Sequence, residues 1–561
     1  MKIIKTNISE KMKKGIIGFL LLSLPLSFQS CTDLLDYALQ ILSQTGWLQE
    51  KEQMNNIPED ITPFDNKDSQ QLKPSVTLEK NFPPIGDQGS YGTCVVWSVG
   101  YNLKTALNAI EKGWTPEQLA DKSYQTSPKD LWFAIPSDSK SAQCNGTNFE
   151  PAMDALIATG AANLSAAPYS GLGSCTGSAA GNSQNKLANY RKIAAKQDGL
   201  SLAEQGLTVE NFKGYLNAGR PIAIGAQLGD RFMKWNSSAV ISSDTYSNPG
   251  MQHAYHAMTL VGYDDNKNAF RVRNSWGTSW GDNGSIWVDY NFFCESFCFA
   301  AFVAQNVSSV SASNGTIESK LSEGYDLLAY SAEDIADPQG EWGPLSRVFT
   351  YDVYNSGDIT ITPSQKWTVV YMYYNAVNAN DYDIIFEDYY TDEFGAGDDY
   401  WAGASGLVGG WWNNYSVESG KKAGEAQYPN GFEISYPMPP ITGKYYLVVM
   451  ADAYNVIPEV NEDNNFYFIT AGNGKPLEFL NGYIQTNITP ASTYAKSSAK
   501  QPARYSNTEN QTPVKPGNLN AYTPQELKAM LLHDKKSGRL QAKMKAFQNN
   551  SNHKEIKRAR R

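Results

Sequence analysis

The sequence predicts an α+β unit followed by an all-β unit built as an antiparallel sandwich. In the first unit, apolar residues recur with a helical period over 94–111 and 149–160. Strand-like runs lie in the same region, at 221–227, 257–263 and 270–273. Over 320–470, short aromatic and β-branched runs alternate with Gly, Asn and Asp turns and no helical pattern occurs, which indicates a sandwich.

Length and composition limit the classes of protein that the chain can represent. With 561 residues, the chain is too long for one ordinary domain and predicts two or three folded units. Apolar residues make up 41% of it, enough to bury real cores. The formal net charge of −10 argues against nucleic acid as the main partner.

The first thirty residues have the pattern of a secretory signal. Lysines precede an apolar run of about 14 residues at 15–28, too short to span a bilayer. Cys31 follows, in a setting that resembles the lipobox of bacterial lipoproteins. We therefore expect acyl chains on Cys31 to anchor the protein to a membrane, at the outer membrane or cell surface, with the periplasmic face as an alternative. The competing interpretation is a plain signal peptide with an unrelated cysteine.

The remaining organisation follows from changes in composition along the chain. Residues 31–75 are mostly polar and predict a linker or a short prosegment, and 76–308 form the α+β unit. The second unit covers 320–472. Its expected strands are Val348–Tyr354, Trp367–Tyr374, Phe432–Tyr436, Tyr445–Ala451 and Phe466–Thr470.

Two further segments complete the chain. Residues 473–520 are rich in Ser, Thr, Asn, Pro and Gln and predict a flexible linker. Residues 521–561 predict a basic helical tail, because Thr523-Pro524-Gln525-Glu526 has the form of a capping box with proline at the first helical position.

A cysteine at the start of the first expected helix is the candidate nucleophile. Cys94 follows a glycine-punctuated loop, and a thiol at a helix N-terminus is stabilised as the thiolate by the helix dipole. We therefore expect its pKa to be lowered, further so beside a protonated histidine. Gln88 precedes it across the glycine turn, and its amide with the Cys94 N–H would form an oxyanion hole.

The chain has four histidines, and one of them begins a strand-like run. His256 would serve as base and acid to the thiol, and Asn274 would accept the second imidazole N–H and fix the tautomer. Trp276 would shield that hydrogen bond from water. His253 fits no such role and is expected at the surface.

These two blocks together resemble the papain family of cysteine peptidases. The stretches QGSYGTCVVWS and HAMTLVGY…RVRNSWGTSWGDNG are similar to its nucleophile and His/Asn motifs, in the family's order. The resemblance implies a two-lobed fold over about 76–300 with the active site in the cleft between the lobes. It implies the oxyanion role for Gln88, the nucleophile for Cys94, acid and base for His256, and orientation for Asn274.

The resemblance also implies a set of substrate-binding residues. They are Gly92, Gly146, Thr147, Gly225, Ala254 and Tyr255, with Thr147 in place of a usual glycine. The last three suggest a pocket for an apolar or aromatic side chain. Tyr91 stands where many members have a disulfide cysteine, and the long helical inhibitory propeptide of many members is missing.

The remaining cysteines suit an oxidising compartment. We expect a bridge between Cys144 and Cys175 and a small loop closed by Cys294 and Cys298, although sequence alone leaves the pairing open.

The second unit resembles the bacterial Ig-like module called the cell-adhesion-related domain (CARDB type), through the hairpin-like stretch at 445–470. An extracellular protein or glycan is the expected kind of ligand. Glu459, Glu462 and Asp463 offer carboxylates for Ca²⁺, although a solvated acidic turn explains them more simply. We therefore predict no metal and no cofactor.

The leading functional hypothesis is a peptidase that hydrolyses proteins or peptides through a Cys94 acyl-enzyme. One alternative is a catalytically silent adhesin or binding scaffold that keeps the fold. The other is an acyl transferase using the same thioester, in which an amine instead of water attacks the intermediate.

Overall fold

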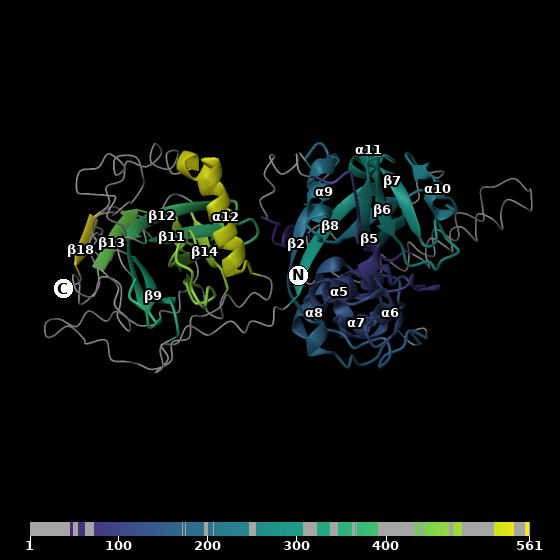
Figure 1. Ribbon diagram of the computed structural model, residues 1–561, viewed down its shortest axis with the longest axis horizontal. Coiled ribbons are helices and arrows are strands. Elements are labelled where there is room, and N and C mark those ends of the chain that lie inside the picture. The colour runs from purple at the N-terminus through teal and green to yellow at the C-terminus, as the bar shows by residue number, and fades with distance from the viewer. Residues whose placement is uncertain are drawn as a thin grey trace, which may run out of the picture.

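The structure is a computed structural model of the full chain (Figure 1). It describes residues 45–48, 54–61, 72–170, 172–173, 175–195, 200–205, 207–245, 254–306, 322–336, 346–361, 365, 367–390, 432–437, 441–470, 475–484, 521–543 and 556–559.

One lobe of the first unit is mostly helical. Its central rod starts at Cys94 and runs without a break to Lys112, where Gly113 adopts φ 64° and ends it. This rod contains a π-helical segment in its middle, and all of the residues of that segment are buried. The helices of this lobe are α4 (Cys94–Val96), η3 (Trp97–Lys104), α5 (Thr105–Lys112), α6 (Pro116–Ala120), α7 (Pro128–Ala134) and α8 (Phe149–Ala158), with short 3₁₀ turns η2 (Glu79–Asn81), η4 (Ser137–Ser139) and η5 (Ser183–Asn185).

The other lobe is built on a twisted, mainly antiparallel sheet. Its strand order is β2-β8-β3-β5-β6-β7-β4, and β1 pairs with β5. The strands are β1 (Ser75–Thr77), β2 (Leu187–Ala195), β3 (Ile222–Leu228), β4 (Val240–Ile241), β5 (Ala254–Asp264), β6 (Ala269–Arg273), β7 (Ser285–Asp289) and β8 (Cys298–Asn306), and the helices beside them are α9 (Val209–Asn217), α10 (Asp230–Met233), α11 (Tyr290–Phe292) and η6 (Phe293–Phe297). The helices and strands expected from periodicity in the first unit are confirmed.

The central rod and strand β5 meet at the boundary between the two lobes. Ser98 donates its hydroxyl to the carbonyl of Met258 at 2.6 Å, and both groups are buried. Because Cys94 begins the rod and His256 lies on β5, this contact holds the two candidate catalytic elements together.

The second unit consists of two sheets that enclose an apolar core. One has the order β18-β13-β10-β9, and the other has the order β12-β11-β14-β16-β17 with β15 paired to β14. Leu327 and Val353 of the first sheet share that core with Val369 and Leu447 of the second, which gives the unit two layers. The strands are β9 (Leu327–Ala336), β10 (Ser346–Asn355), β11 (Trp367–Asn375), β12 (Tyr382–Tyr390), β13 (Phe432–Pro437), β14 (Gly443–Met450), β15 (Phe466–Ile469), β16 (Leu477–Leu480), β17 (Tyr483–Ile484) and β18 (Ile556–Ala559).

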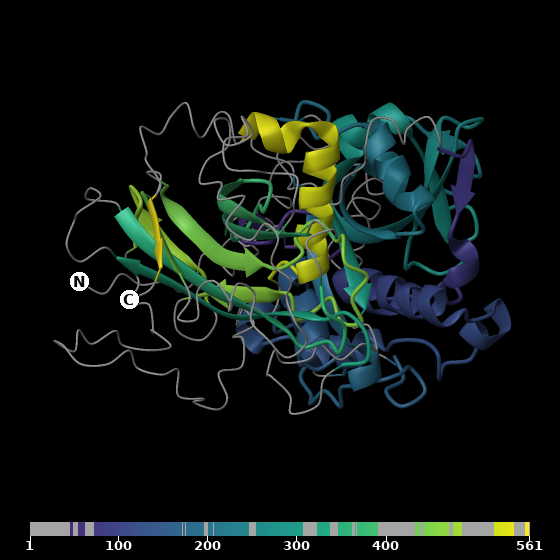
Figure 2. The same ribbon diagram turned by 60° about the vertical axis from the view of Figure 1, so that its left-hand side comes forward.

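The C-terminal helix α12 (Pro524–Ser537) covers the outer face of the second sheet. Its capping box is present as predicted, with Thr523 and Glu526 exchanging hydrogen bonds. Leu527, Met530 and Leu531 are buried against Val370 and Met372 of β11. Figures 1 and 2 show α12 on the side of the second unit that faces the first.

Two expectations for the C-terminal region are therefore corrected. The helix is not a separate tail, because its apolar side packs on a sheet. The expected linker also contains strands β16 and β17. Leu477 and Phe479 of β16 alternate with exposed residues and lie in the apolar core of the second unit.

Among the described residues, no helix is long and apolar enough to cross a membrane.

Candidate active site

The loop before Cys94 is shaped to deliver the thiol to the end of a helix. Gly89 has φ 62° and donates its N–H to the Asp87 carboxylate at 2.8 Å, which tightens the turn. The helix then begins at Cys94 itself. The backbone N–H groups of Cys94 and Val95 face the sulfur, as expected at a helix N-terminus.

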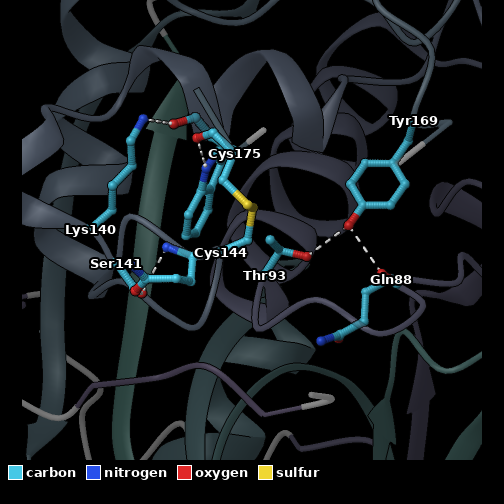
Figure 3. Close-up of a disulfide and its surroundings, with 9 residues drawn as sticks. Gln88, Thr93, Lys140, Ser141, Cys144, Tyr169 and Cys175 are labelled. Carbon is cyan, nitrogen blue, oxygen red and sulfur yellow. Dashed lines mark hydrogen bonds between the residues drawn. A yellow bond between two sulfur atoms is a disulfide. The ribbon is translucent and has the colours of Figure 1, made fainter. Parts of the chain in front are cut away.

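Tyr169 fixes this loop from the other side (Figure 3). Its hydroxyl lies 2.9 Å from the Thr93 hydroxyl and 3.0 Å from the Gln88 carbonyl oxygen. Its ring packs edge-on against Trp97, with centroids 4.8 Å apart. Tyr169 thus binds a side chain on one side and the backbone on the other side of the turn that positions Cys94.

The histidine and asparagine lie together as the sequence predicts. His256 Nε2 is 2.7 Å from Asn274 Oδ1, and that oxygen also accepts the Ser275 N–H at 2.8 Å. The Trp276 ring lies over the imidazole with centroids 4.7 Å apart. Because Nε2 is bound to the amide, Nδ1 is the nitrogen left for the thiol, and it makes no hydrogen bond with any described residue in this form.

The sulfur of Cys94 lies beside the strand that carries His256. The N–H of Ala257, the next residue on β5, points to the sulfur and favours the thiolate. The structure therefore brings Cys94, His256 and Asn274 to one place from three separate elements.

Gln88 links the loop to the asparagine segment. Its Oε1 accepts the Ser275 hydroxyl at 2.7 Å, and its backbone N–H donates to the Ser275 carbonyl at 2.9 Å. Its Nε2 donates to the Tyr91 carbonyl at 2.8 Å, within its own loop. In this conformation the amide expected at the oxyanion hole is thus held in place by its neighbours.

The protonation of the pair differs from the expectation. Burial raises the pKa of Cys94 to about 12, despite the surrounding N–H groups that lower it. Burial also lowers the pKa of His256 to about 4, against the Asn274 hydrogen bond that raises it. Both groups are therefore neutral at pH 7 in this form. The expected lowering of the thiol pKa is wrong here because neither side chain is accessible to solvent.

A short segment from the N-terminal region covers the pair. Cys94 and His256 each have 0% of their surface exposed. The Gly46 N–H points to the Cys94 sulfur. A Cβ on Gly46 would come within 2.0 Å of the Gly92 carbonyl oxygen, so the chain passes directly over the loop that carries the thiol.

This covering segment (Thr45–Leu48) is paired with the cleft like an added strand. Leu48 donates to the Thr147 carbonyl at 3.1 Å, and Thr147 donates to the Gly46 carbonyl at 2.9 Å, in parallel register. Trp47 donates to the Tyr255 carbonyl at 3.3 Å on the opposite wall. The segment thus bridges both lobes.

The Trp47 ring fills a pocket that contains two predicted substrate-binding residues, Gly225 and Tyr255, together with Phe149. It packs edge-on against Tyr255 and Phe149, with centroids 5.8 and 5.6 Å away. A Cβ on Gly225 would meet the ring at 2.4 Å, so only glycine leaves room for it.

The other predicted subsite residues lie along the same segment. Gly92 approaches Thr45 and Asn145, and Gly146, with φ 144°, approaches Gly46 and Leu48. Ala254 is placed by its backbone alone, at the start of β5.

The cysteines divide into one bridge and three thiols within the described residues. Cys144 and Cys175 form a disulfide in the helical lobe (Figure 3). Cys294 and Cys298 are separate buried thiols, so the expected small loop is not closed. The segment η6 ends between them, and Cys298 instead directs its thiol to the Ala300 carbonyl at 3.4 Å. Cys31 and His253 lie outside the described residues.

Two of the three carboxylates considered for Ca²⁺ are bonded within the protein. Glu459 accepts the Leu327 N–H at 2.5 Å and the Asn465 amide at 2.7 Å, and Glu462 pairs with Lys528 of α12 at 2.6 Å. No group of three or more metal-ligating side chains suited to a metal occurs in the described part of the chain.

Sequence reasoning missed two contributors to the site. Tyr169 lies in an irregular stretch with no pattern around it. Trp47 carried a weak signal: it is a large aromatic residue in a polar segment, and such a residue needs a place to be buried.

Comparisons with known proteins find relatives of the first unit. Residues 74–302 match the family model described as papain family cysteine protease. The chain is 28% identical over 228 residues to cysteine protease Amb a 11.0101 of Ambrosia artemisiifolia, which covers 40% of this chain and 52% of the relative. It is also 27% identical over 229 residues to cysteine proteinase 3 of Entamoeba histolytica. This match covers 39% of the present chain and 64% of the relative.

The chain thus spans about half to two thirds of the length of these curated relatives. Among solved structures, xylellain, a cysteine protease from Xylella fastidiosa, is similar with a TM-score of 0.39 and 18% identity, covering 48% of this chain and 97% of that one. Family assignment rests on the sequence match together with the arrangement of Cys94, His256 and Asn274. Residues 74–302 are therefore similar to the papain family of cysteine proteases.

Proposed function

We propose that this protein hydrolyses peptide bonds with Cys94 as nucleophile. One observation carries the proposal. Cys94 lies at a helix N-terminus beside the strand of His256, whose Nε2 is bound to Asn274 at 2.7 Å so that Nδ1 remains for the thiol.

The reaction follows from these positions. Cys94 transfers its proton to His256 Nδ1, and the thiolate attacks the peptide carbonyl carbon to give a tetrahedral intermediate. The C–N bond breaks as His256 protonates the leaving amine, and the acyl group stays on sulfur as a thioester. His256 then takes a proton from water, whose oxygen attacks the thioester and releases the acid and the Cys94 thiol.

The other site residues assist without bonding to the substrate carbon. Asn274 keeps the imidazole in one tautomer, and Trp276 excludes water from that bond. Gln88 and the Cys94 N–H stabilise the oxyanion once a substrate displaces the bond from Gln88 to the Tyr91 carbonyl.

The substrate class is a protein or peptide in extended form. The backbone of Thr147 and Tyr255 already binds an extended strand, Thr45–Leu48, through its main chain. The Trp47 pocket, with Gly225 at its base, suits a large apolar or aromatic side chain.

The structure describes a covered form of this site, so substrate hydrolysis requires displacement of Thr45–Leu48. The test is hydrolysis of unfolded protein substrates by a Trp47→Ala variant, compared with the same variant carrying Cys94→Ala. Cleavage by the first and none by the second supports the proposal. Added amines separate hydrolysis from acyl transfer, because a transferase would give amide products.

The covered cleft is the one observation that favours the alternative of a silent binding scaffold. That alternative predicts no cleavage by Trp47→Ala in a fully folded state, and no reaction with a thiol-directed epoxide.

We further propose that the protein is a secreted bacterial lipoprotein anchored through Cys31, at the outer membrane or cell surface. The lysine-rich start and apolar run of 15–28 support secretion. The disulfide Cys144–Cys175 suits an oxidising compartment. Incorporation of labelled palmitate that disappears in Cys31→Ser tests the anchor.

We propose that the second unit is an Ig-like sandwich of the CARDB type that binds an extracellular protein or glycan. Its two layers with a shared core support this assignment. Binding of the full chain to a glycan array, lost in a variant that keeps the thermal unfolding profile, tests the ligand.

A further inference from the structure

The chain that covers the active site continues into the seam between the two units. Thr45–Leu48 lies over Cys94, and residues 54–61 of the same segment lie against β2 of the first unit. The Pro58 carbonyl accepts the Lys192 N–H at 2.8 Å, and the Asp60 N–H donates to the Lys192 carbonyl at 2.8 Å. Asp60 also pairs with Arg220 at 2.9 Å.

The opposite side of residues 54–61 is held by the second unit. The Glu59 N–H donates to the Val377 carbonyl at 2.7 Å. The Tyr522 hydroxyl lies 2.7 Å from the Glu59 carbonyl and 2.8 Å from the Val377 carbonyl. Ile61 is buried in the apolar cluster between β11 and α12. Residues 58–61 thus form hydrogen bonds and apolar contacts with both units.

One arginine of the first unit binds the start of α12. Arg191 of β2 binds Glu526 through two hydrogen bonds of 2.8 and 2.6 Å, and donates to the Ala521 carbonyl at 2.9 Å. Its guanidinium lies over the Tyr522 ring, 4.7 Å from the centroid. The arginine side chain is 1% exposed, so this bidentate pair is shielded from water.

We propose that the second unit and α12 act as a latch that keeps residues 54–61 on the peptidase domain and, through them, Thr45–Leu48 over the active site. The inference rests on the proposed peptidase function. Within the described residues, Thr45–Leu48 is bonded to the cleft through the main chains of Thr147 and Tyr255. Because residues 54–61 are anchored nearby, Thr45–Leu48 has a high local concentration at the cleft and stays over Cys94. Any event that draws α12 away from Arg191 would therefore uncover the thiol.

A cavity of about 290 Å³ lies at the same seam. Its lining includes Asp60 and Ile61 of the N-terminal segment, Tyr215 of the first unit, and Met530 and His533 of α12. The contact between the units thus leaves a cavity beside residues 58–61.

The experiment measures how fast an epoxide that alkylates papain-type thiols labels Cys94 in the full chain, followed by mass spectrometry. Tyr522→Phe removes the hydroxyl that bonds to Glu59 and Val377. We expect labelling about fivefold faster, which is the population change for loss of one typical hydrogen bond. Glu526→Lys places a cation against Arg191, and we expect at least tenfold faster labelling.

Two further variants calibrate the result. Trp47→Ala acts on the covering segment directly and should accelerate labelling by at least tenfold. Tyr445→Phe removes a comparable hydroxyl bond, to Asp381 at 3.0 Å, inside the second unit, and should stay within twofold of wild type.

The outcomes separate the latch from the proposed function. If Trp47→Ala is fast while Tyr522→Phe and Glu526→Lys label at the wild-type rate, the latch is wrong and the peptidase function stands. If Cys94 is labelled as fast in Tyr445→Phe as in Tyr522→Phe, the acceleration comes from a general loss of stability of the second unit, and the latch is wrong. If no folded variant is labelled, Trp47→Ala included, the peptidase proposal itself fails.

Discussion

At the scale of single residues, the site is complete but held in a neutral state. Cys94 and His256 have the neighbours that nucleophilic catalysis needs, yet burial favours the thiol over the thiolate and the imidazole over the imidazolium. Opening of the site to water would remove this burial, so the pKa of His256 would return toward its ordinary 6.5 and the pKa of Cys94 would fall. The covering segment therefore acts on catalysis through solvation as well as through steric exclusion.

Asn274 is expected to act by orientation. Asn274→Ala removes the acceptor 2.7 Å from His256 Nε2, so the imidazole loses its preferred tautomer and position. In a Trp47→Ala background, we expect kcat to fall by about 10- to 100-fold with little change in KM. Steady-state kinetics on a peptide substrate measure both values.

Asn291→Ala is the matched control, because Asn291 is an exposed asparagine of the same lobe. A fall in kcat of similar size in Asn291→Ala, or an unchanged kcat in Asn274→Ala, would contradict the orienting role.

Acid should open the covered form. Burial lowers the pKa of His256 to about 4 from its ordinary 6.5, so an uncovered His256 gains a proton between these values while the covered one does not. The covered form is fully favoured above pH 6.5 and loses stability as pH falls toward 4. Between pH 7 and pH 5 we expect the open population to rise by up to about twentyfold.

Hydrogen exchange of residues 45–48, corrected for the intrinsic exchange rate at each pH, measures this opening. His256→Gln should abolish the acid effect. An equal effect in His256→Gln would assign it to other titrating groups.

At the scale of elements, two glycines leave the space that Thr45–Leu48 needs to cross the cleft. Gly225 on β3 leaves room for the Trp47 ring, and Gly46 leaves room for the chain to pass the Gly92 carbonyl. Neither residue needs a positive φ, so space alone explains the glycines. The pocket and its occupant are thus matched in shape.

Gly225→Ala tests this match. The added Cβ would lie 2.4 Å from the Trp47 ring, so the covered form should be destabilised and Cys94 labelling should be about tenfold faster. The double variant Trp47→Ala/Gly225→Ala should label no faster than Trp47→Ala alone, because the clash is gone. Additive effects of the two changes would contradict contact between these residues.

Regular patterns made most elements predictable from sequence. The rod from Cys94, the strand of His256 and the five expected strands of the second unit carry clear periodicity, and the structure confirms them. Strand β12 was missed because Asp383, Glu387 and Asp388 interrupt its apolar pattern. Thr45–Leu48 was missed because four residues have no period, and their partners Thr147 and Tyr255 are distant in the chain.

At the scale of the whole molecule, the second unit is connected to catalysis through the N-terminal segment. Sequence suggested a linker, a sandwich and a tail as separate parts. Their docking was not predictable, because it depends on a buried arginine pair, Arg191 with Glu526, and on main-chain bonds to Glu59. Such contacts produce no periodic pattern in the sequence of either segment.

The helix α12 should contribute measurably to the stability of this assembly. Thr523→Ala removes the side-chain cap of α12 and its exchange with Glu526, at a cost of about 1 kcal/mol. Urea unfolding of the full chain, followed by the fluorescence of the second unit, should show a lower midpoint. Ser537→Ala, at the other end of the helix, should leave the midpoint unchanged, and an equal drop there would contradict the capping argument.

The most direct measurement maps the epoxide adduct on folded Trp47→Ala by mass spectrometry. The three free cysteines of the described residues, Cys94, Cys294 and Cys298, serve as internal comparisons. We predict modification at Cys94 alone, lost when His256→Ala is added, since only that thiol has a base and an opened cleft. Equal modification of all three thiols, or none of Cys94 in the folded protein, would contradict the assignment of a catalytic site covered by residues 45–48.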